Sequence, residues 1–388
     1  MAQIHYNNRP CYFSAHDTCI KAMPLSQVDP SNYHEQLDIK VKKIREQFSC
    51  FEPPALEVFD SAPLNYRMRA EFKIWHEGND SFYVMFKADS PKKPHRIDDF
   101  VIGSSIITNL MPMIMSEVKK RRLLREKLFQ CEFLTTLSGQ ALVTLIYHKK
   151  LDDNWLNIAK TLETQLNIRV IGRSRKQKLV LSEAFVTETL NVCGQLFHFQ
   201  QVESGFTQPN AGVNQKMLGW ALKQTKGIGN DLVELYCGNG NFTVVLAQNF
   251  NRVLATEISK TSVRSALYNF DLNNIHNVQV ARMSSEEFSS ALLGSRTFRR
   301  LAEIDLESYH FSTVLVDPPR AGLDENTTDL ISRFDNIIYI SCNPSTLHDN
   351  LNSICKSHSI EHFALFDQFP YTDHIECGVM LKRKKNEL

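Results

Sequence analysis

The sequence predicts an α/β protein with two folded domains, and three observations support this prediction. The chain has 388 residues, and one domain usually holds about 100–150. Its second half alternates short apolar runs with helical stretches, which is typical of a doubly wound parallel sheet. Its first half pairs strand with strand between flanking helices, which is typical of an α+β domain. We therefore expect an irregular extension over residues 1–30, an α+β domain over 31–205 and an α/β domain over 206–388.

The elements of the first half follow from periodicity, caps and turn residues. The sequence HEGND interrupts an alternating apolar stretch, which indicates a hairpin. The expected elements are a helix over 31–48 capped by Ser31, the hairpin over 66–86, a helix over 103–128, two strands over 128–150 joined across Ser138–Gly139, a helix over 151–166, and β-rich sequence to about residue 202.

Seven strands are expected in the second half, and the last two lie close together in sequence. Helical stretches separate most of the others, so the strands should run parallel with helices on both faces. This arrangement predicts a seven-stranded, Rossmann-like domain. The strands are expected at 231–236, 252–257, 278–283, 311–317, 336–341, 361–367 and 376–382.

Composition excludes several classes of protein. Hydrophobic residues make up 43% and charged residues 22%, which is ordinary for a globular chain and argues against disorder. No apolar run is long enough to span a membrane, and the polar first residues give no secretory signal. The nine cysteines form no CxxC pair, so we expect neither a disulfide framework nor a metal or iron–sulfur site. A reducing, cytoplasmic location fits this cysteine usage.

The net charge of +1 hides an asymmetry between the two halves. Residues 1–200 hold 27 Lys and Arg against 22 Asp and Glu, whereas residues 201–388 hold 17 against 21. Basic residues gather in the stretches 119–127 (KKRRLLREK) and 173–178 (RSRKQK). A lone charge run is usually a solvated helix face. Two such runs in one half favour a nucleic-acid backbone as partner.

A glycine-rich turn follows the first strand of the second half. Gly238 and Gly240, in the sequence CGNGNF, allow a tight turn and close approach to a ligand. Glu257 lies 19 residues beyond Gly238, at the end of the next strand, where an acid accepts hydrogen bonds from ribose hydroxyls. Thr243 stands where a dinucleotide-binding fingerprint has its third glycine. The pattern therefore favours S-adenosylmethionine over NAD as cofactor.

Three further residue groups are expected at the same end of the sheet. The fourth strand ends in DPPR, Asp317 to Arg320, and the fifth ends in SCNP, which contains Cys342. A cysteine at a strand end beside the cleft is placed to act as a nucleophile, although most cysteines are inert core residues. Glu376 begins the last strand, and it reaches the same rim if that strand is antiparallel.

These residue types suit methylation of a pyrimidine at carbon 5. That carbon is a poor nucleophile until a thiolate adds to carbon 6 and generates an enolate. A base must then remove the carbon 5 proton so that the thiolate can leave. Cys342, Glu376 and a methyl donor at the Gly238 turn meet these needs.

The motifs FTQPN, LELYCGNGNF, VDPPR, SCNP and FPYTDHIECGVMLK resemble the uracil-5-methyltransferase family of RNA. The stretches YRMRAEFKIWH, LTTL and YHKKLDD are similar to its bacterial tRNA branch, whose members make ribothymidine at position 54 of the T loop. The resemblance implies that Cys342 is the nucleophile and Glu376 the proton acceptor. It also implies an S-adenosylmethionine site lined by Gln208, Tyr236, Asn241, Glu257 and Asp317. Ribosomal-RNA relatives carry a cysteine-ligated iron–sulfur cluster, for which this chain has no clustered cysteines in its first half.

The first half then becomes an α+β RNA-binding domain, because a base in a stacked helix is out of reach and must be flipped out. Arg69, Phe129 and His148 are the candidates for stacking on the opened loop. Core packing is an equal alternative for Phe129. Lys119 and Arg121, from the first basic run, are candidate phosphate contacts. The expected partner is tRNA, with tmRNA as a further candidate and no membrane or obligate protein partner.

Two alternatives to a tRNA uridine methyltransferase stay open from the residues. An RNA cytosine-5 methyltransferase also adds a cysteine to carbon 6, but such enzymes usually carry a second cysteine in the fourth-strand loop. The DPPR sequence has none. A different class is an RNA-folding factor with secondary catalysis, which the basic half and the need to open the T loop both favour.

Overall fold

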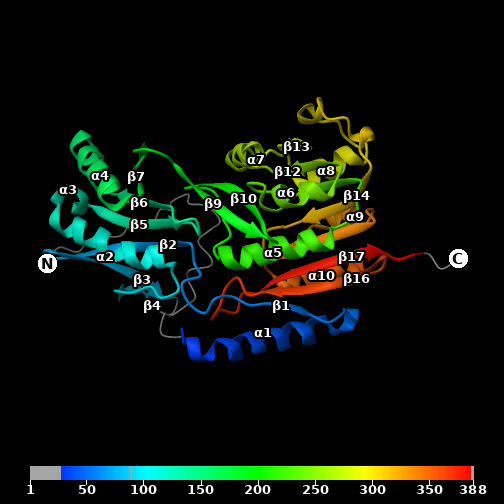
Figure 1. The fold of residues 1–388 in the computed structure, drawn as a ribbon, viewed down its shortest axis with the longest axis horizontal. Helices are drawn as coiled ribbons and strands as arrows, with labels where there is room; N and C mark the ends of the chain where they lie inside the picture. Colours follow the sequence, from blue (N-terminus) through cyan, green and yellow to red (C-terminus); the bar gives the residue numbers. More distant parts are fainter. Residues whose placement is uncertain (1–27, 88–89, 386–388) are drawn as a thin grey trace.

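The computed structural model of the protein describes residues 28–385 except 88–89. The described chain forms two large sheets, joined by a two-stranded ribbon (Figure 1). The extension predicted for residues 1–30 lies outside the described residues, apart from its last three. No helix in the described part of the chain is long and apolar enough to cross a membrane.

The C-terminal sheet contains all seven predicted strands, and β1 adds an eighth at its edge. The order is β1-β16-β17-β15-β14-β11-β12-β13, and β17 alone runs antiparallel to its two neighbours. Every residue of β11 is buried, because helices cover both faces of the sheet. The strands are β1 (Glu57–Phe59), β11 (Asp231–Leu235), β12 (Arg252–Thr256), β13 (Val278–Ala281), β14 (Phe311–Val316), β15 (Asn336–Ser341), β16 (His358–Phe366) and β17 (Glu376–Arg383).

Two hydrophobic cores enclose this sheet, one on each face. The first core contains side chains of α1 (Tyr33–Phe48), α8 (Ser285–Leu292), α9 (Glu325–Ile331) and α10 (Pro344–Ile354). The second contains side chains of α5 (Ala211–Gln224), α6 (Asn241–Leu246) and α7 (Lys260–Leu272). Short 3₁₀ turns complete the described chain: η2 (Pro30–Asn32), η3 (Ser49–Phe51), η4 (Ala247–Asn249), η5 (Arg299–Leu301) and η6 (Leu306–Ser308).

Helix α1 packs against the C-terminal sheet, although it falls within the α+β domain predicted over residues 31–205. Leu37, Val41 and Ile44 recur at helical spacing and are buried in the core of that sheet. The start of the helix also differs from the prediction. Asp29, rather than Ser31, is the capping side chain, and it accepts a hydrogen bond from the Ser31 N–H in the turn η2 that leads into α1.

The N-terminal sheet has seven strands in the order β4-β3-β2-β5-β6-β7-β8, with helices packed on one face. Strand β4 was not anticipated, and the predicted helix over 103–128 is interrupted at Arg121. The backbone of Arg121 is extended, so α2 ends one residue earlier. The elements are β2 (Arg69–Glu77), β3 (Asp80–Lys87), β4 (Ser90–Ile97), α2 (Ser105–Lys120), α3 (Arg122–Arg125), β5 (Leu128–Thr135), β6 (Ala141–Tyr147), α4 (Asp153–Leu166), β7 (Arg169–Ser174) and β8 (Gln177–Val180).

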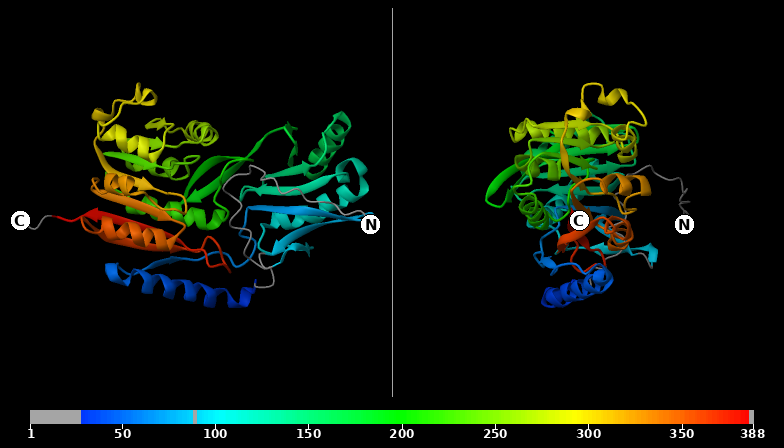
Figure 2. Two further views of the ribbon diagram at one scale, coloured as in Figure 1. Left: turned by 180° about the vertical axis from the view of Figure 1, so that it is seen from behind. Right: turned by 90° about the vertical axis from the view of Figure 1, so that its right-hand side faces the viewer.

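The ribbon of β9 (Phe185–Val192) and β10 (Gln195–Val202) lies between the two sheets (Figure 2). Asparagine side chains at the C-terminal end of α7 accept hydrogen bonds from backbone N–H groups of β10. The amide oxygen of Asn273 accepts the His198 N–H at 2.8 Å, and that of Asn269 accepts the Gln200 N–H at 2.7 Å. Asn269 also donates to the carbonyl of Asn239 in the glycine-rich turn. The ribbon is thereby tied to the predicted cofactor site.

Candidate active site

The predicted reactive and cofactor residues meet at one edge of the C-terminal sheet. This edge is where the parallel strands end, which is where ligands bind in open α/β sheets. Because β17 is antiparallel, its first residue lies at the same edge. The residues that gather there are Gly238 after β11, Glu257 after β12, Asp317 after β14, Cys342 after β15 and Glu376 at the start of β17.

The glycine-rich turn is built around left-handed backbone and an anchored carboxylate. Gly238 and Gly240 have φ values of +57° and +82°, and a Cβ on Gly240 would lie 3.0 Å from the Phe270 ring. One carboxylate oxygen of Glu257 accepts the Gly238 N–H at 3.1 Å, and the other accepts the Ser259 N–H at 2.6 Å. The turn and the acid thus hold each other in place.

Tyr236 and Asn241, two more of the predicted cofactor residues, flank this turn in the sequence. The side-chain amide of Asn241 exchanges two hydrogen bonds of 2.9 Å with Asn214. The hydroxyl of Tyr236, which has a φ of +62°, lies 2.5 Å from the Ser285 hydroxyl. Asn214 was missed because it stands inside the buried helix α5, where no strand-end signal marks it.

Gln208 belongs to the segment that enters α5. Its amide oxygen accepts a 3.4 Å hydrogen bond from Gln368, which follows β16. The site therefore offers a carboxylate suited to ribose hydroxyls, together with amide and hydroxyl groups, on a turn with space at Gly238. This donor and acceptor set fits S-adenosylmethionine, which when bound supplies an electrophilic methyl group.

Cys342 and Glu376 are neighbours across the β15–β17 ladder. Ser341 pairs with Cys377 at the end of this ladder, so Cys342 and Glu376, the residues that flank that pair, lie at the same end of the two strands. Burial, the Glu376 charge and Asp317 together raise the pKa of the Cys342 thiol to about 12. Burial and Asp317 raise the pKa of Glu376 well above its ordinary value. Burial alone raises the pKa of Asp317 to about 7.

Arg320, from the DPPR motif, is a cation at this cluster, and its charge lowers the pKa of both Cys342 and Glu376. The Arg320 charge changes these two pKa values less than burial does. Its guanidinium donates to His374 with an N–N distance of 2.9 Å, and its carbonyl accepts from Asn343 at 2.9 Å. Burial and the Arg320 charge lower the pKa of His374, so its imidazole is a neutral acceptor. The sequence analysis did not single out His374.

The three candidates for RNA stacking have different surroundings. Phe129 and His148 stack on each other with ring centroids 4.2 Å apart, and the Lys73 ammonium lies 4.2 Å from the Phe129 centroid. Phe129 is half-buried and His148 is exposed, so this pair is not part of the core. Arg69 is directed elsewhere, because its guanidinium donates to the backbone carbonyls of Glu203 and Gly205.

Acidic side chains lie against much of the two basic runs. Lys119 pairs with Asp80 at 2.6 Å, and Arg121 pairs with Glu117 at 2.9 Å. In the second run, Arg173 and Lys178 both bind the buried carboxylate of Glu203. A backbone phosphate would therefore compete with these acids for the basic groups.

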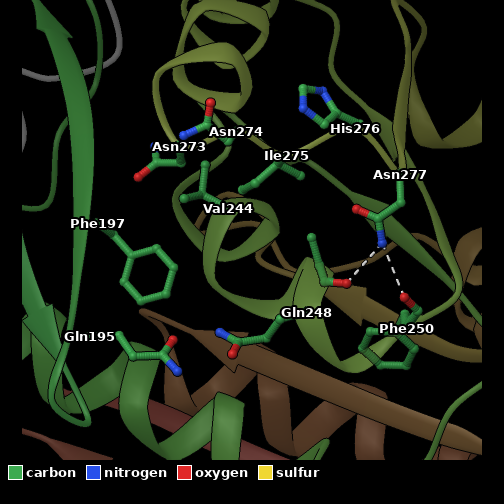
Figure 3. Close-up of a pocket in the computed structure, with 11 residues that line it drawn as sticks. Gln195, Phe197, Val244, Gln248, Phe250, Asn273, Asn274, Ile275, His276 and Asn277 are labelled. Carbon is green, nitrogen blue, oxygen red and sulfur yellow. Dashed lines mark hydrogen bonds between the residues drawn. The ribbon is translucent and has the colours of Figure 1, made fainter.

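A pocket on the outer side of the C-terminal domain contains none of the predicted site residues. It lies between β10, α6 and the segment that joins α7 to β13 (Figure 3). Its amides are largely engaged, since Asn277 donates to the carbonyls of Ala247 and Phe250. Within the described ranges, no group of three His, Cys, Asp or Glu residues is arranged to hold a metal ion.

Comparison with known proteins identifies the class first. The structure is similar to that of the Pyrococcus abyssi tRNA (uracil-54, C5)-methyltransferase in complex with S-adenosyl-L-homocysteine, with a TM-score of 0.69. The likeness covers 90% of this chain and 83% of that one at 19% sequence identity. This chain therefore shares the fold of that methyltransferase, and the predicted Rossmann-like α/β fold is confirmed.

The family follows from sequence. The family model described as tRNA (Uracil-5-)-methyltransferase matches residues 32–384, so the chain belongs to that family. The tRNA/tmRNA (uracil-C(5))-methyltransferase of Saccharophagus degradans is 57% identical, over 93% of this chain and 99% of that protein. The protein of the same name from Colwellia psychrerythraea is 54% identical, over 92% and 100%. The predicted family, enzyme class and cofactor are thereby confirmed.

The raised pKa of Cys342 predicts how its reactivity depends on pH in the protein without ligands. An ordinary thiol, with a pKa of about 8.5, approaches its maximal alkylation rate near pH 9–10. The Cys342 thiol should instead react roughly tenfold faster per pH unit from pH 7 to 10 without levelling off, because its thiolate fraction keeps rising. Iodoacetamide labelling with peptide mapping measures this rate, and Cys342→Ala identifies the peptide. A plateau near pH 9 would contradict the prediction.

Proposed function

We propose that this enzyme transfers the methyl group of S-adenosylmethionine to carbon 5 of uridine 54 in the T loop of tRNA, through a covalent adduct of Cys342 with carbon 6. The observation that carries the proposal is that Cys342 and Glu376 flank the last β15–β17 pair, Ser341 with Cys377, at the rim that also bears the Glu257–Gly238 turn. The names of the relatives from S. degradans and C. psychrerythraea support tRNA, and also tmRNA, as substrates. A cytoplasmic location belongs to the same proposal.

The reaction begins at Cys342. Burial keeps the free thiol protonated, so as the sulfur bonds to carbon 6 of a flipped uracil, the S–H bond breaks and its proton passes to solvent water. The resulting enolate gives carbon 5 the electron pair that takes up the methyl group. Arg320, the cation of this cluster, lies where it can balance the developing negative charge.

Glu376 completes the reaction. After methyl transfer, carbon 5 carries both a methyl group and a proton. The Glu376 carboxylate accepts that proton, the carbon–sulfur bond breaks, and the thiolate of Cys342 leaves. Burial raises the pKa of Glu376, and a carboxylate with a raised pKa is a stronger base than an exposed one.

RNA binding is proposed for the N-terminal domain, and the Phe129–His148 pair is its main contact. An exposed imidazole stacked on an aromatic ring, with a lysine nearby, offers a surface on which an unstacked base can lie. Arg69 shapes the segment that enters α5, through the carbonyls of Glu203 and Gly205. Lys119 and Arg121 add phosphate contacts only if RNA displaces Asp80 and Glu117.

Adduct formation should depend on Cys342, and adduct release on Glu376. With tRNA containing 5-fluorouridine at position 54, the wild type should be trapped covalently, because fluorine does not leave as a proton does. Cys342→Ala should not be trapped. With normal tRNA, Glu376→Gln should accumulate an adduct that the wild type releases. Denaturing gels measure the protein–RNA species, and peptide mapping locates the bond.

Cys355→Ala provides the matched control, since Cys355 is a half-buried cysteine at the other end of α10 and should be trapped like the wild type. Attachment of RNA to Cys237 or Cys377 would overturn the assignment. The function itself is tested by mass spectrometry of tRNA from cells that lack the gene. Undiminished 5-methyluridine at position 54 would refute it.

The aromatic pair should contribute to RNA affinity and not to cofactor affinity. Phe129→Ala and His148→Ala should each weaken tRNA binding by roughly tenfold, because base–aromatic stacking contributes about 1–3 kcal/mol. S-adenosylmethionine affinity should not change. Phe82→Ala is the control, since Phe82 also lies under a cation, Arg96, on the same sheet. Equal tRNA affinity in all four proteins, measured by filter binding, would remove the pair from the interface.

A further inference from the structure

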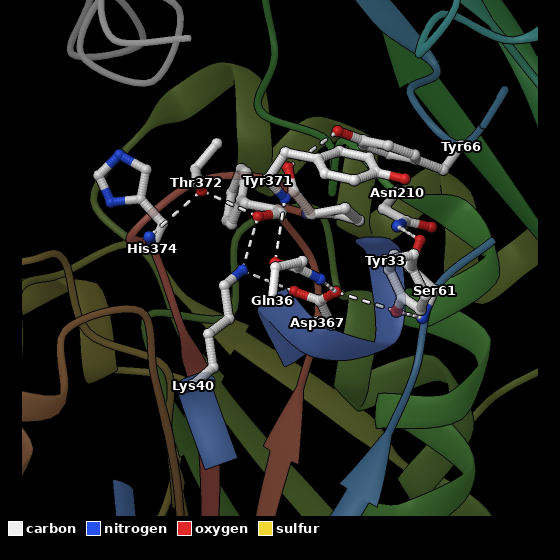
Figure 4. Close-up of polar contacts among 12 residues, drawn as sticks. Tyr33, Gln36, Lys40, Ser61, Tyr66, Asn210, Asp367, Tyr371, Thr372 and His374 are labelled. Atoms are coloured by element: carbon white, nitrogen blue, oxygen red, sulfur yellow. Dashed lines mark hydrogen bonds and ion pairs between the residues drawn. The ribbon is translucent and has the colours of Figure 1, made fainter. Parts of the chain in front are cut away.

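A buried ion pair lies next to the active-site rim and takes no part in the reaction proposed above. The Lys40 ammonium is 2.7 Å from one carboxylate oxygen of Asp367, and the two residues are 5% and 1% exposed. The other oxygen accepts from the Tyr33 hydroxyl at 3.0 Å and from Gln36 at 3.2 Å (Figure 4). Lys40 also donates to the carbonyl of Phe369 at 2.8 Å. Asp367 follows β16 directly, so these contacts fix the start of the segment that leads to β17.

One face of α1 supplies all the donors. Tyr33, Gln36 and Lys40 are spaced by three and four residues, so their side chains project from the same side of the helix. Leu37 and Val41 pack in the core of the sheet beside them. The apolar contacts therefore set the position of α1, and its polar groups are held rigidly against residues 367–375.

The same contacts continue along residues 367–375 to the reacting groups. The backbone N–H of Tyr371 donates to Gln36 at 3.2 Å, and the hydroxyl of Thr372 donates to the Phe369 carbonyl at 2.8 Å. The N–H of His374 in turn donates to the Thr372 hydroxyl at 3.2 Å, and the His374 ring accepts from Arg320. Glu376 is the second residue after His374. Direct hydrogen bonds thus link α1 to His374 and Arg320, and a single residue of chain separates His374 from Glu376.

We propose that Lys40 and Asp367 are positioning residues for Glu376: their ion pair fixes residues 367–375, so that Glu376 faces Cys342 and His374 holds Arg320 beside both. This inference rests on the proposed function. It adds that removal of the carbon 5 proton by Glu376 requires the Lys40–Asp367 ion pair. Neither residue touches the substrate. The Lys40 charge also contributes to lowering the pKa of His374, which agrees with their proximity.

A purely structural role for the ion pair predicts a different outcome. The network also reaches the cofactor side, because the Tyr33 hydroxyl accepts from the Ser61 N–H, and the Ser61 hydroxyl accepts from Asn210, the cap of α5. If the pair only held α1 in place, its loss would weaken cofactor binding and adduct formation together. A positioning role predicts that only the step assigned to Glu376 slows.

The test compares Lys40→Met with Lys42→Met, the same change at an exposed lysine of the same helix. Lys40→Met should lower steady-state turnover at least tenfold and raise the fraction of enzyme held as covalent RNA adduct, as Glu376→Gln does. Its S-adenosylmethionine affinity and its rate of adduct formation should stay within twofold of wild type. Lys42→Met should match wild type in every measurement.

Lys40→Met can fail to fold, because removing one partner of a buried ion pair leaves an uncompensated charge. Two further variants test the proposal without leaving such a charge. Lys40→Met with Asp367→Asn removes both charges at nearly constant volume, and Gln36→Ala removes the Tyr371 contact without leaving a charge. Both should accumulate adduct, Gln36→Ala to a smaller extent. Accumulation no greater than in Lys42→Met, in whichever of these variants fold, would overturn the positioning role.

Failure of this proposal is distinguishable from failure of the proposed function. If the wild type forms no adduct with 5-fluorouridine tRNA, the function is wrong whatever the Lys40 variants do. If Cys342→Ala and Glu376→Gln behave as proposed while Lys40→Met resembles Lys42→Met, only the positioning role is wrong. A Lys40→Met protein that loses cofactor affinity and adduct formation in parallel supports the structural role instead.

Discussion

The antiparallel pairing of β17 with β15 is the interaction on which the candidate active site depends. In a wholly parallel sheet, the first residue of β17 would lie at the opposite edge from the end of β15. The reversed direction puts Glu376 beside Cys342, about 34 residues later in the chain, at the rim where β11 and β12 present the glycine-rich turn and Glu257. One change of strand direction thus brings the proposed nucleophile, the proposed base and the glycine-rich turn together.

Burial dominates the electrostatics of this rim. It raises the pKa of Cys342, Asp317 and Glu376, and the Arg320 charge only partly offsets the effect on the thiol and on Glu376. The thiol of Cys342, the proposed nucleophile, is therefore protonated before substrate binds. The same desolvation makes the Glu376 carboxylate a stronger base. In the proposed reaction, burial thus keeps the Cys342 thiol protonated before attack and makes Glu376 a stronger proton acceptor after methyl transfer.

Contacts between distant parts of the chain hold this arrangement. Helix α1 comes from the first 50 residues, yet it packs on the C-terminal sheet and binds the segment after β16 through Lys40. The ribbon β9–β10 joins the two sheets and is fixed to the glycine-rich turn through Asn269. The ribbon therefore links the domain proposed to bind RNA to the active-site rim. None of the residues proposed to bind RNA lies at that rim.

The sequence by itself determined what depends on short-range pattern: the seven strands of the second half, the glycine-rich turn with Glu257, and the strand-end placement of Asp317, Cys342 and Glu376. These signals are local, because strand ends and turns are encoded by neighbouring residues. Only the tertiary structure decided which sheet α1 joins, that Asn214 pairs with Asn241, and that His374 accepts from Arg320. Those partners are separated by 27 residues or more. No periodicity or motif specifies such contacts, since they arise only when the packed elements bring distant side chains together.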